Sequence, residues 1–229
     1  MINEVRTVSN DRNLACILAA VAGALNTAGF YIVGLYSSNM TGNVSALADQ
    51  ATTGGYLAAA IYLALVVIFI AGAATSTVLI NAGRRSGMAG VYAVNLATEA
   101  VLLAGLGCAD LWLPQVGRGP LLAFGLSFLM GLQNAMVTRI SDARIRTTHV
   151  TGMITDIGIE LGHLALGTPE RVVDRAKLRL HGATVAAFLV GGMAGVLVYQ
   201  AAGALLFFVA AALLLALAIP GLAAHRTPG

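Results

Sequence analysis

Glu99 is the residue whose position most clearly suggests chemistry, because it lies in the middle of the apolar segment VYAVNLATEAVLLAGL. A charge at the centre of a bilayer costs about 2.5–3.5 kcal/mol on insertion scales, so such a residue usually faces the protein interior and marks a pathway. Asn95 lies one helical turn before it on the same face. We expect Glu99 to bind a proton or a cation that couples transport. A protonated, hydrogen-bonded structural glutamate is the alternative.

A second group of titratable residues, Asp156, Glu160 and His163, lies in TGMITDIGIELGHLALG. Spacings of four and three residues put them on one helical face, and a histidine titrates near neutral pH. This stripe predicts a proton relay or the lining of a vestibule, and its alternative is an amphipathic helix whose charges meet arginine-rich loops. Glu160 and His163 match half of a di-iron pattern, but the sequence lacks the other half, so we expect neither a metal nor another cofactor.

Two similar stretches open the two halves of the chain, GALNTAGFYIVGLYSSNMTGNVSAL from Gly23 and GLQNAMVTRISDARIRTTHVTGMITDI from Gly131. Each runs from an asparagine through irregular polar residues to Thr-Gly and a new helical pattern. Helices that begin there would point their free N–H groups and positive dipole ends into a break. We expect the breaks to bind an anion or a polar solute with carbonyl or carboxylate oxygens; a plain helix cap with a tight turn is the alternative. The predicted binding residues are Asn26, Ser38, Thr41, Gly42, Asn43, Asn134, Thr151 and Gly152.

These two stretches also carry a family resemblance. NTAGFYIVGLYSSNMTGN together with GLQNAM…TTHVTGMI resembles the YoaK-type family of small bacterial inner-membrane proteins, a domain of unknown function, and the resemblance covers essentially the whole chain. The second stretch departs from the first at Met153, where the first has Asn43. The resemblance implies a multi-span membrane protein and no settled substrate.

The composition requires a membrane environment for the elements that position these residues. The 229-residue chain is 58% apolar and only 10% charged, whereas soluble domains carry about 25% charged residues. The net charge of +3 fits basic cytoplasmic loops and forms no nucleic-acid patch. A helical crossing needs about 20 apolar residues, and six segments qualify: Leu14–Tyr36, Leu57–Ile80, Met88–Trp112, Pro120–Val137, Ala183–Tyr199 and Ala201–Ile219.

The orientation follows from the basic residues. Two further segments, Asn39–Gln50 and Val150–Gly167, are short for a crossing. If both re-enter without crossing, and both termini are cytoplasmic, the lysines and arginines divide 12 inside to 1 outside, with Arg118 the outside one; if both cross, they divide 8 to 5. The positive-inside rule favours the first topology. We therefore expect a multi-pass protein of the inner membrane.

The predicted fold class is an all-α membrane protein with six transmembrane helices arranged as a 3+3 inverted repeat with two interrupted, re-entrant segments. The first repeat is residues 14–112 with a break near 37–50, and the second is 113–222 with a break near 138–167. Residues 1–13 and 223–229 form cytoplasmic tails. In secondary transporters with such repeats, the substrate lies near the midplane where the helices break.

The predicted function is a small secondary transporter for a small polar or anionic solute, with proton coupling as an option. A channel of the same architecture and a non-transporting membrane scaffold are the alternatives. An intramembrane enzyme is disfavoured because the sequence has no Gly-x-Ser-x-Gly, His-Glu-x-x-His or paired catalytic aspartates. The expected partners are the solute or ion and the lipid bilayer, without nucleic acid. Gly191 and Gly195 allow a close helix contact, either inside the chain or in a homodimer.

The topology makes a prediction that labelling can check. In a variant without Cys16 and Cys108, Arg84→Cys and Arg144→Cys should react with a membrane-impermeant thiol reagent only after the inner membrane is permeabilised, whereas Arg118→Cys should react in intact spheroplasts. Labelling of position 84 or 144 from the external face would mean that the two halves run in the same direction, which contradicts the inverted repeat.

Overall fold

The protein is described by a computed structural model that covers residues 8–88, 90–141, 147–166 and 174–223. These ranges contain helices and no strand, so the predicted all-α class is confirmed. The eight helices in the described part of the chain are α1 (Val8–Val33), α2 (Met40–Thr53), α3 (Tyr56–Arg85), α4 (Val91–Trp112), α5 (Gln115–Ile140), α6 (Val150–Leu166), α7 (Arg175–Ala202) and α8 (Leu205–Ala223).

Six of these helices, α1, α3, α4, α5, α7 and α8, are long and apolar enough to cross a membrane. They correspond to the six predicted spans, which supports a multi-pass membrane protein. The remaining helices, α2 and α6, correspond to the two short segments. α7 begins at Arg175, earlier than the expected Ala183. The turn that separates α7 from α8 lies at Gly203, whose positive φ of 54° suits glycine.

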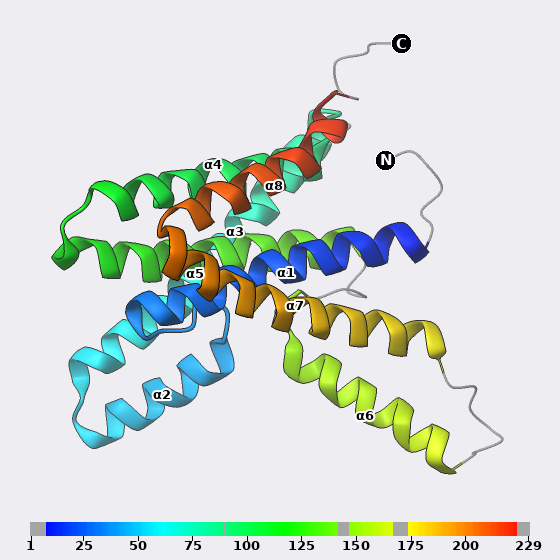
Figure 1. Ribbon diagram of the computed structural model, residues 1–229, viewed down its shortest axis with the longest axis horizontal. Coiled ribbons are helices and arrows are strands. Elements are labelled where there is room, and N and C mark those ends of the chain that lie inside the picture. The colour runs from blue at the N-terminus through cyan, green and yellow to red at the C-terminus, as the bar shows by residue number, and fades with distance from the viewer. Residues whose placement is uncertain (1–7, 89, 142–146, 167–173, 224–229) are drawn as a thin grey trace.

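The long helices lie roughly along the long axis of the molecule, which is horizontal in Figure 1. α1 begins and α8 ends at the same end, on the right of the view. The two short helices both begin near the middle of the molecule and diverge, α2 toward the left-hand end and α6 toward the right-hand end. Their starting points therefore lie close to the centre of the bundle, and from there the two helices diverge toward opposite ends of the molecule.

Several helix contacts in the first half of the chain have counterparts in the second half. α1 packs against α7, and α5 packs against α3; α2 lies on α3 as α6 lies on α7. The pairs α1–α5 and α4–α8 join equivalent helices of the two halves. The large α4–α5 contact has no comparable α1–α8 contact in the described part of the chain, so the likeness between the halves is partial.

The crossing of α1 and α7 depends on glycines at the point of closest approach. A Cβ atom on Gly23 of α1 would collide with the backbone oxygen of Phe188 on α7. A Cβ atom on Gly191 of α7 would collide with the backbone oxygen of Ala20 on α1. Gly195 meets α1 in the same way, at Ala24. The Gly191–Gly195 pair is therefore used for packing within the chain.

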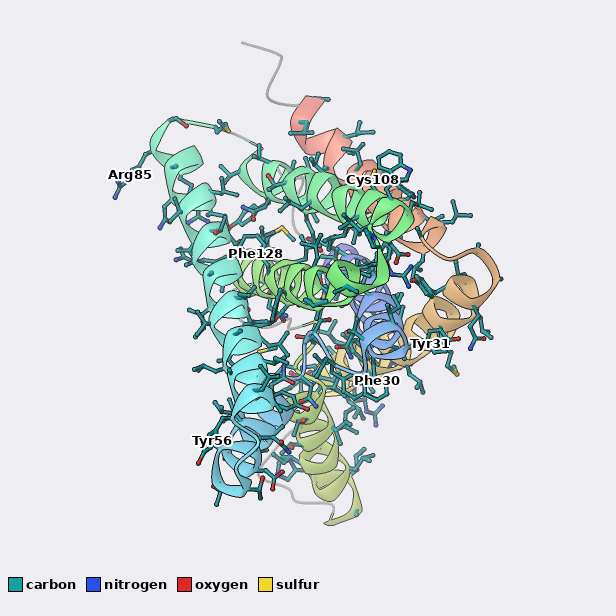
Figure 2. The ribbon with its side chains drawn as sticks, turned by 90° about the vertical axis from the view of Figure 1, so that its left-hand side faces the viewer. Phe30, Tyr31, Tyr56, Arg85, Cys108 and Phe128 are labelled. Atoms are coloured by element: carbon teal, nitrogen blue, oxygen red, sulfur yellow. The ribbon has the colours of Figure 1, made fainter. Side chains whose placement is uncertain are left out.

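The crossing of α3 and α5 repeats this construction. A Cβ atom on Gly131 of α5 would collide with the backbone oxygen of Phe69 on α3, and one on Gly72 of α3 with that of Phe128 on α5. Figure 2 shows Phe128 beside the middle of α3, whose two ends are marked by Tyr56 and Arg85. Small residues let helix backbones approach closely in a membrane, where dispersion contacts drive association. Each crossing places at least one glycine from each helix against the backbone of the other.

The buried core lies where α1, α4, α5 and α8 meet and includes Leu25, Leu103, Leu126 and Phe207. In contrast, α3 leaves large apolar side chains such as Leu63, Val67 and Ile70 exposed. A helix with apolar side chains both inside and outside the fold is expected when lipid replaces water as the solvent.

An ionic cluster joins three helices at the end where α4 and α7 finish. Both carboxylate oxygens of Asp110 on α4 accept a hydrogen bond from the Tyr199 hydroxyl on α7, at 3.0 and 2.9 Å. Arg118 Nε on α5 lies 3.4 Å from the same carboxylate. Asp110 is almost fully buried, so these partners compensate for its removal from solvent.

The glycine crossings predict a sharp loss of stability on small substitutions. Gly23→Ala and Gly131→Ala should each lower the free energy of unfolding by about 1–3 kcal/mol. The added Cβ would collide with a backbone oxygen of the partner helix, and that oxygen cannot rotate away. Gly105→Ala is the control, since a Cβ there meets nothing within 4 Å; it should raise stability by up to about 1 kcal/mol through helix propensity. Thermal unfolding in detergent, followed by the helical circular dichroism signal, measures both. Equal effects at all three positions would contradict the close crossings.

Candidate functional site

The first break begins where α1 ends. Gly34 has a positive φ of 72°, which lets the chain reverse after Val33, and the rings of Phe30 and Tyr36 stack 4.2 Å apart across the reversal. Ser38 then donates two hydrogen bonds to Asn26 Oδ1, one from its backbone N–H and one from its hydroxyl, both 2.9 Å long. Because Asn26 lies well before the end of α1, the chain has folded back along the helix it has just left.

α2 follows this folded-back segment and begins with a side-chain cap. Asn39 Oδ1 accepts a hydrogen bond of 3.1 Å from the backbone N–H of Gly42, the usual role of an N-cap asparagine. A Cβ on Gly42 would press against the Asn39 carboxamide, so this cap needs glycine. Asn43 is buried and donates 3.2 Å to the backbone oxygen of Tyr36, which fixes the loop.

The second break is built in the same way. Thr148 donates a 2.8 Å hydrogen bond from its hydroxyl to Asn134 Oδ1, as Ser38 does to Asn26. The residue after it, His149, precedes α6 as Asn39 precedes α2, and a Cβ on Gly152 would collide with the His149 ring. In each break, the asparagine therefore binds a hydroxyl residue two positions before the first residue of the short helix.

A cavity of about 730 Å³ lies between the two breaks. It is bounded by the first turns of both α2 and α6, by both asparagines, and by Phe69 and Phe188 from the two glycine crossings. No lysine, arginine, aspartate or glutamate is among its lining residues, so the positive dipole ends of α2 and α6 contribute strongly to its electrostatics. The lining residues are Asn26, Tyr36, Ser38, Asn39, Met40, Thr41, Phe69, Asn134, Thr138, Thr148, His149, Val150, Thr151, Gly152 and Phe188.

Two further pockets flank this cavity and differ in character. One, of about 660 Å³, shares Phe69, Asn134 and Thr138 with the cavity and is also lined by Arg84 and Arg139 near the ends of α3 and α5. The other, of about 770 Å³, lies along α6 and α7 and is lined mainly by apolar side chains. The cavity therefore adjoins a pocket with two arginines and a mainly apolar pocket, and it shares lining residues with each.

The predicted binding residues fall into two groups. Asn26, Ser38, Thr41, Asn134, Thr151 and Gly152 line the cavity. Gly42 and Asn43 are not among its lining residues, because both are engaged in building the start of α2.

Sequence reasoning missed several residues that line the cavity. Asn39 and His149 occupy the same position before each Thr-Gly, and Thr148 matches Ser38, so aligning the two copies position by position would have found them. Phe69 and Phe188 carry no such signal, because they come from helices remote from the breaks in sequence.

The predicted coupling residues lie outside the cavity. Glu99 is 0% exposed within α4 and interacts with Gln133 on α5. Among the described residues, no three histidine, cysteine, aspartate or glutamate side chains gather as metal ligands would.

The stripe on α6 faces the start of α7. Asp156 Oδ2 lies 3.4 Å from Lys177 Nζ and 3.5 Å from His181 Nδ1. Glu160 accepts a 3.2 Å hydrogen bond from the backbone N–H of Asp174. These contacts tie α6 to the start of α7 through a lysine, a histidine and a backbone N–H, and no arginine is among these partners. His163 lies on the same helix, partly exposed.

Comparison with known proteins places the chain in a family without assigning an activity. No curated protein and no solved structure matches it. The family model described as "Protein of unknown function (DUF1275)" matches residues 14–220. The chain therefore belongs to the DUF1275 family, which includes the YoaK-type proteins that its two repeated stretches resemble.

Proposed function

We propose that this protein is a small secondary transporter that moves a small anionic or polar solute across the inner membrane, with the solute bound between the two helix breaks. The observation that carries the proposal is the cavity that both breaks line together, because irregular backbone at membrane depth persists only inside protein or beside a hydrated space. Its volume of about 730 Å³ falls within the range of small-molecule sites.

An inverted 3+3 repeat is part of this proposal. The matched helix contacts, the two glycine crossings and the two asparagine–hydroxyl hydrogen bonds support an internal repeat. The opposite directions of α2 and α6 support an inverted one (Figure 1), and the fold-back of Ser38 onto Asn26 supports re-entry of the first break. With the basic residues inside, both termini are cytoplasmic and the Arg84–Arg139 pocket opens toward the cytoplasm.

The chemistry of the cavity favours a solute that presents oxygens with negative charge. Helix N-termini attract anions through their free N–H groups and their dipoles, and two of them border this cavity. The hydroxyls of Thr41 and Thr151 supply additional donors, while no lining carboxylate repels an anion. Arg84 and Arg139 raise the local concentration of anions at the adjoining pocket.

Repeat symmetry also supplies a transport cycle. In transporters of this kind, one part of the protein rocks against the other around a fixed site. Here the tight pairs α1–α7 and α3–α5 each contribute one phenylalanine to the cavity wall, Phe188 and Phe69. Rocking one pair against the other would open the cavity first through the basic pocket and then through the apolar one.

The proposal predicts which variants lose solute binding. Purified parent protein is screened by thermal shift against small carboxylates, inorganic phosphate, sulfate and neutral polar solutes, and an anion is expected to raise the melting temperature. Asn26→Ala and Asn134→Ala should weaken its binding about tenfold or more, because hydrogen bonds to charged groups contribute about 1.5–3 kcal/mol. Asp156→Asn, outside the cavity, is the control and should bind like the parent. Unchanged affinity in the two folded alanine variants would refute the site.

The ligand found in this screen then separates transport from conduction. In proteoliposomes, a transporter should accumulate it against its gradient with saturation, whereas a channel only equilibrates it. Parent-like accumulation by the Asn26→Ala or Asn134→Ala variant would again refute the site.

A further inference from the structure

A buried polar cluster at the contact of α4 and α5 is incompletely hydrogen-bonded. Asn95, Glu99 and Gln133 are each 0% exposed. Gln133 is close enough to interact with Glu99, yet no hydrogen bond of good geometry reaches either Glu99 oxygen, either amide atom of Asn95, or Gln133 Nε2. Buried polar groups are rarely left without partners, because an unsatisfied group loses its hydrogen bonds to water without replacement. The cluster therefore lacks a component that would satisfy it.

One proton supplies what is missing. An ionised carboxylate only accepts hydrogen bonds, so it gives Asn95 Oδ1 no donor. When a proton from water bonds to one Glu99 oxygen, that oxygen becomes an O–H donor for Asn95 Oδ1. The other oxygen can then accept from Asn95 Nδ2 and Gln133 Nε2. Asn95 and Glu99 are one helical turn apart, which is the spacing that such a pair needs.

No countercharge competes for this role among the described residues. α8 carries no charged side chain between Leu205 and Ala223. On α3, Arg84 contacts the Tyr92 hydroxyl and Arg85 is exposed at the helix end. The other charged groups of α4 and α5 have partners elsewhere: Asp110 pairs with Arg118, and Arg139 Nη1 lies 3.5 Å from Asn81 Oδ1. No ion pair joins any of these charged groups to Glu99.

A pair of hydrogen bonds connects this cluster to the cavity. The Thr147 hydroxyl donates to Gln133 Oε1 over 3.4 Å. The next residues on both segments repeat the contact at the cavity wall, where Thr148 donates to Asn134 Oδ1 over 2.8 Å. Gln133 thus has Glu99 on one side and the start of the α6 segment on the other. The first break has Leu25 at the position equivalent to Gln133, so it lacks this connection.

We propose that Glu99 is the proton-binding residue of this protein, and that Gln133 and Thr147 transmit its protonation to the start of α6 at the cavity. The proposal rests on the proposed function in taking the cavity as the solute site. Loss of the proton leaves a carboxylate that draws the amide groups of Asn95 and Gln133 toward itself. Turning the Gln133 carboxamide shifts its Oε1 away from Thr147, and the adjacent Thr148–Asn134 contact changes with it.

The first test detects the proton directly. Infrared difference spectra of the protein in lipid, recorded from about pH 5 to about pH 9, should contain a carboxyl C=O band that titrates. Glu99→Gln should abolish this band, and Asp156→Asn, the control carboxylate on α6, should leave it in place. A parent without a titrating band, or a band that survives in folded Glu99→Gln, would overturn the assignment.

The second test follows the transmission. In a variant without Cys16 and Cys108, Thr151→Cys reports accessibility of the cavity to a water-soluble maleimide, and Thr53→Cys, at the exposed end of α2, corrects for thiol ionisation. The ratio of the two labelling rates should change about tenfold between about pH 5 and about pH 9. The control exchanges sodium chloride for choline chloride at constant pH. If the labelling ratio changes with this exchange and not with pH, Glu99 binds a metal cation instead of a proton, and the proposal is overturned.

Gln133→Leu, which copies the residue of the first break, isolates the link between the two ends. This variant should retain the titrating infrared band and lose the pH dependence of labelling. The test of the transmission path therefore does not depend on whether Glu99→Gln folds. Labelling that still follows pH in Gln133→Leu would overturn the transmission path. If the cavity binds its solute while neither the band nor the labelling responds to pH, the Glu99 assignment fails and the proposed function stands. Unchanged binding in Asn26→Ala and Asn134→Ala would instead remove the proposed function.

Discussion

In the proposed topology both breaks lie inside the bilayer, where lipid offers no partners to backbone N–H and C=O groups that leave a helix. In each break, an asparagine on the preceding helix accepts a hydrogen bond from a hydroxyl residue on the returning chain, Asn26 from Ser38 and Asn134 from Thr148. These contacts hold the returning chain against the helix it came from. The short helices then start in the middle of the bundle, and their first turns line the cavity between the breaks.

The glycine crossings extend this constraint to the whole bundle. Each break lies beside a helix of the other half, because α7 crosses α1 and α3 crosses α5 at glycine–carbonyl contacts. The residues that touch those glycines, Phe188 and Phe69, are also cavity residues. Close packing and the cavity therefore depend on the same few positions. A substitution that separates α1 from α7 changes the wall of the cavity as well as the stability of the fold.

Hydropathy and length were sufficient to predict the six long helices and the two short ones, since lipid requires about 20 apolar residues per crossing. Six residues of the repeated Asn and Thr-Gly stretches line the cavity, whereas Gly42 and Asn43 take part in building the start of α2. Asn39 and His149 were missed because these equivalent positions, two residues before each Thr-Gly, hold different residue types. The partners of Asp156 depend on where α7 begins, and the contact of Gln133 with Glu99 depends on how α4 lies on α5. Neither contact can be predicted from the residues close by in the sequence.

The differences between the halves are as informative as their likeness. A symmetric scaffold would give its two alternative openings equal contacts, so any preference between them has to come from residues that break the symmetry. Gln133 in place of Leu25 and Arg84 beside Arg139 are such residues. Both sets belong to the side formed by α3, α4 and α5, which carries the basic pocket and the Glu99 cluster. Attraction of an anion and response to a proton would then act on the same opening, which is the arrangement that coupling between the two requires.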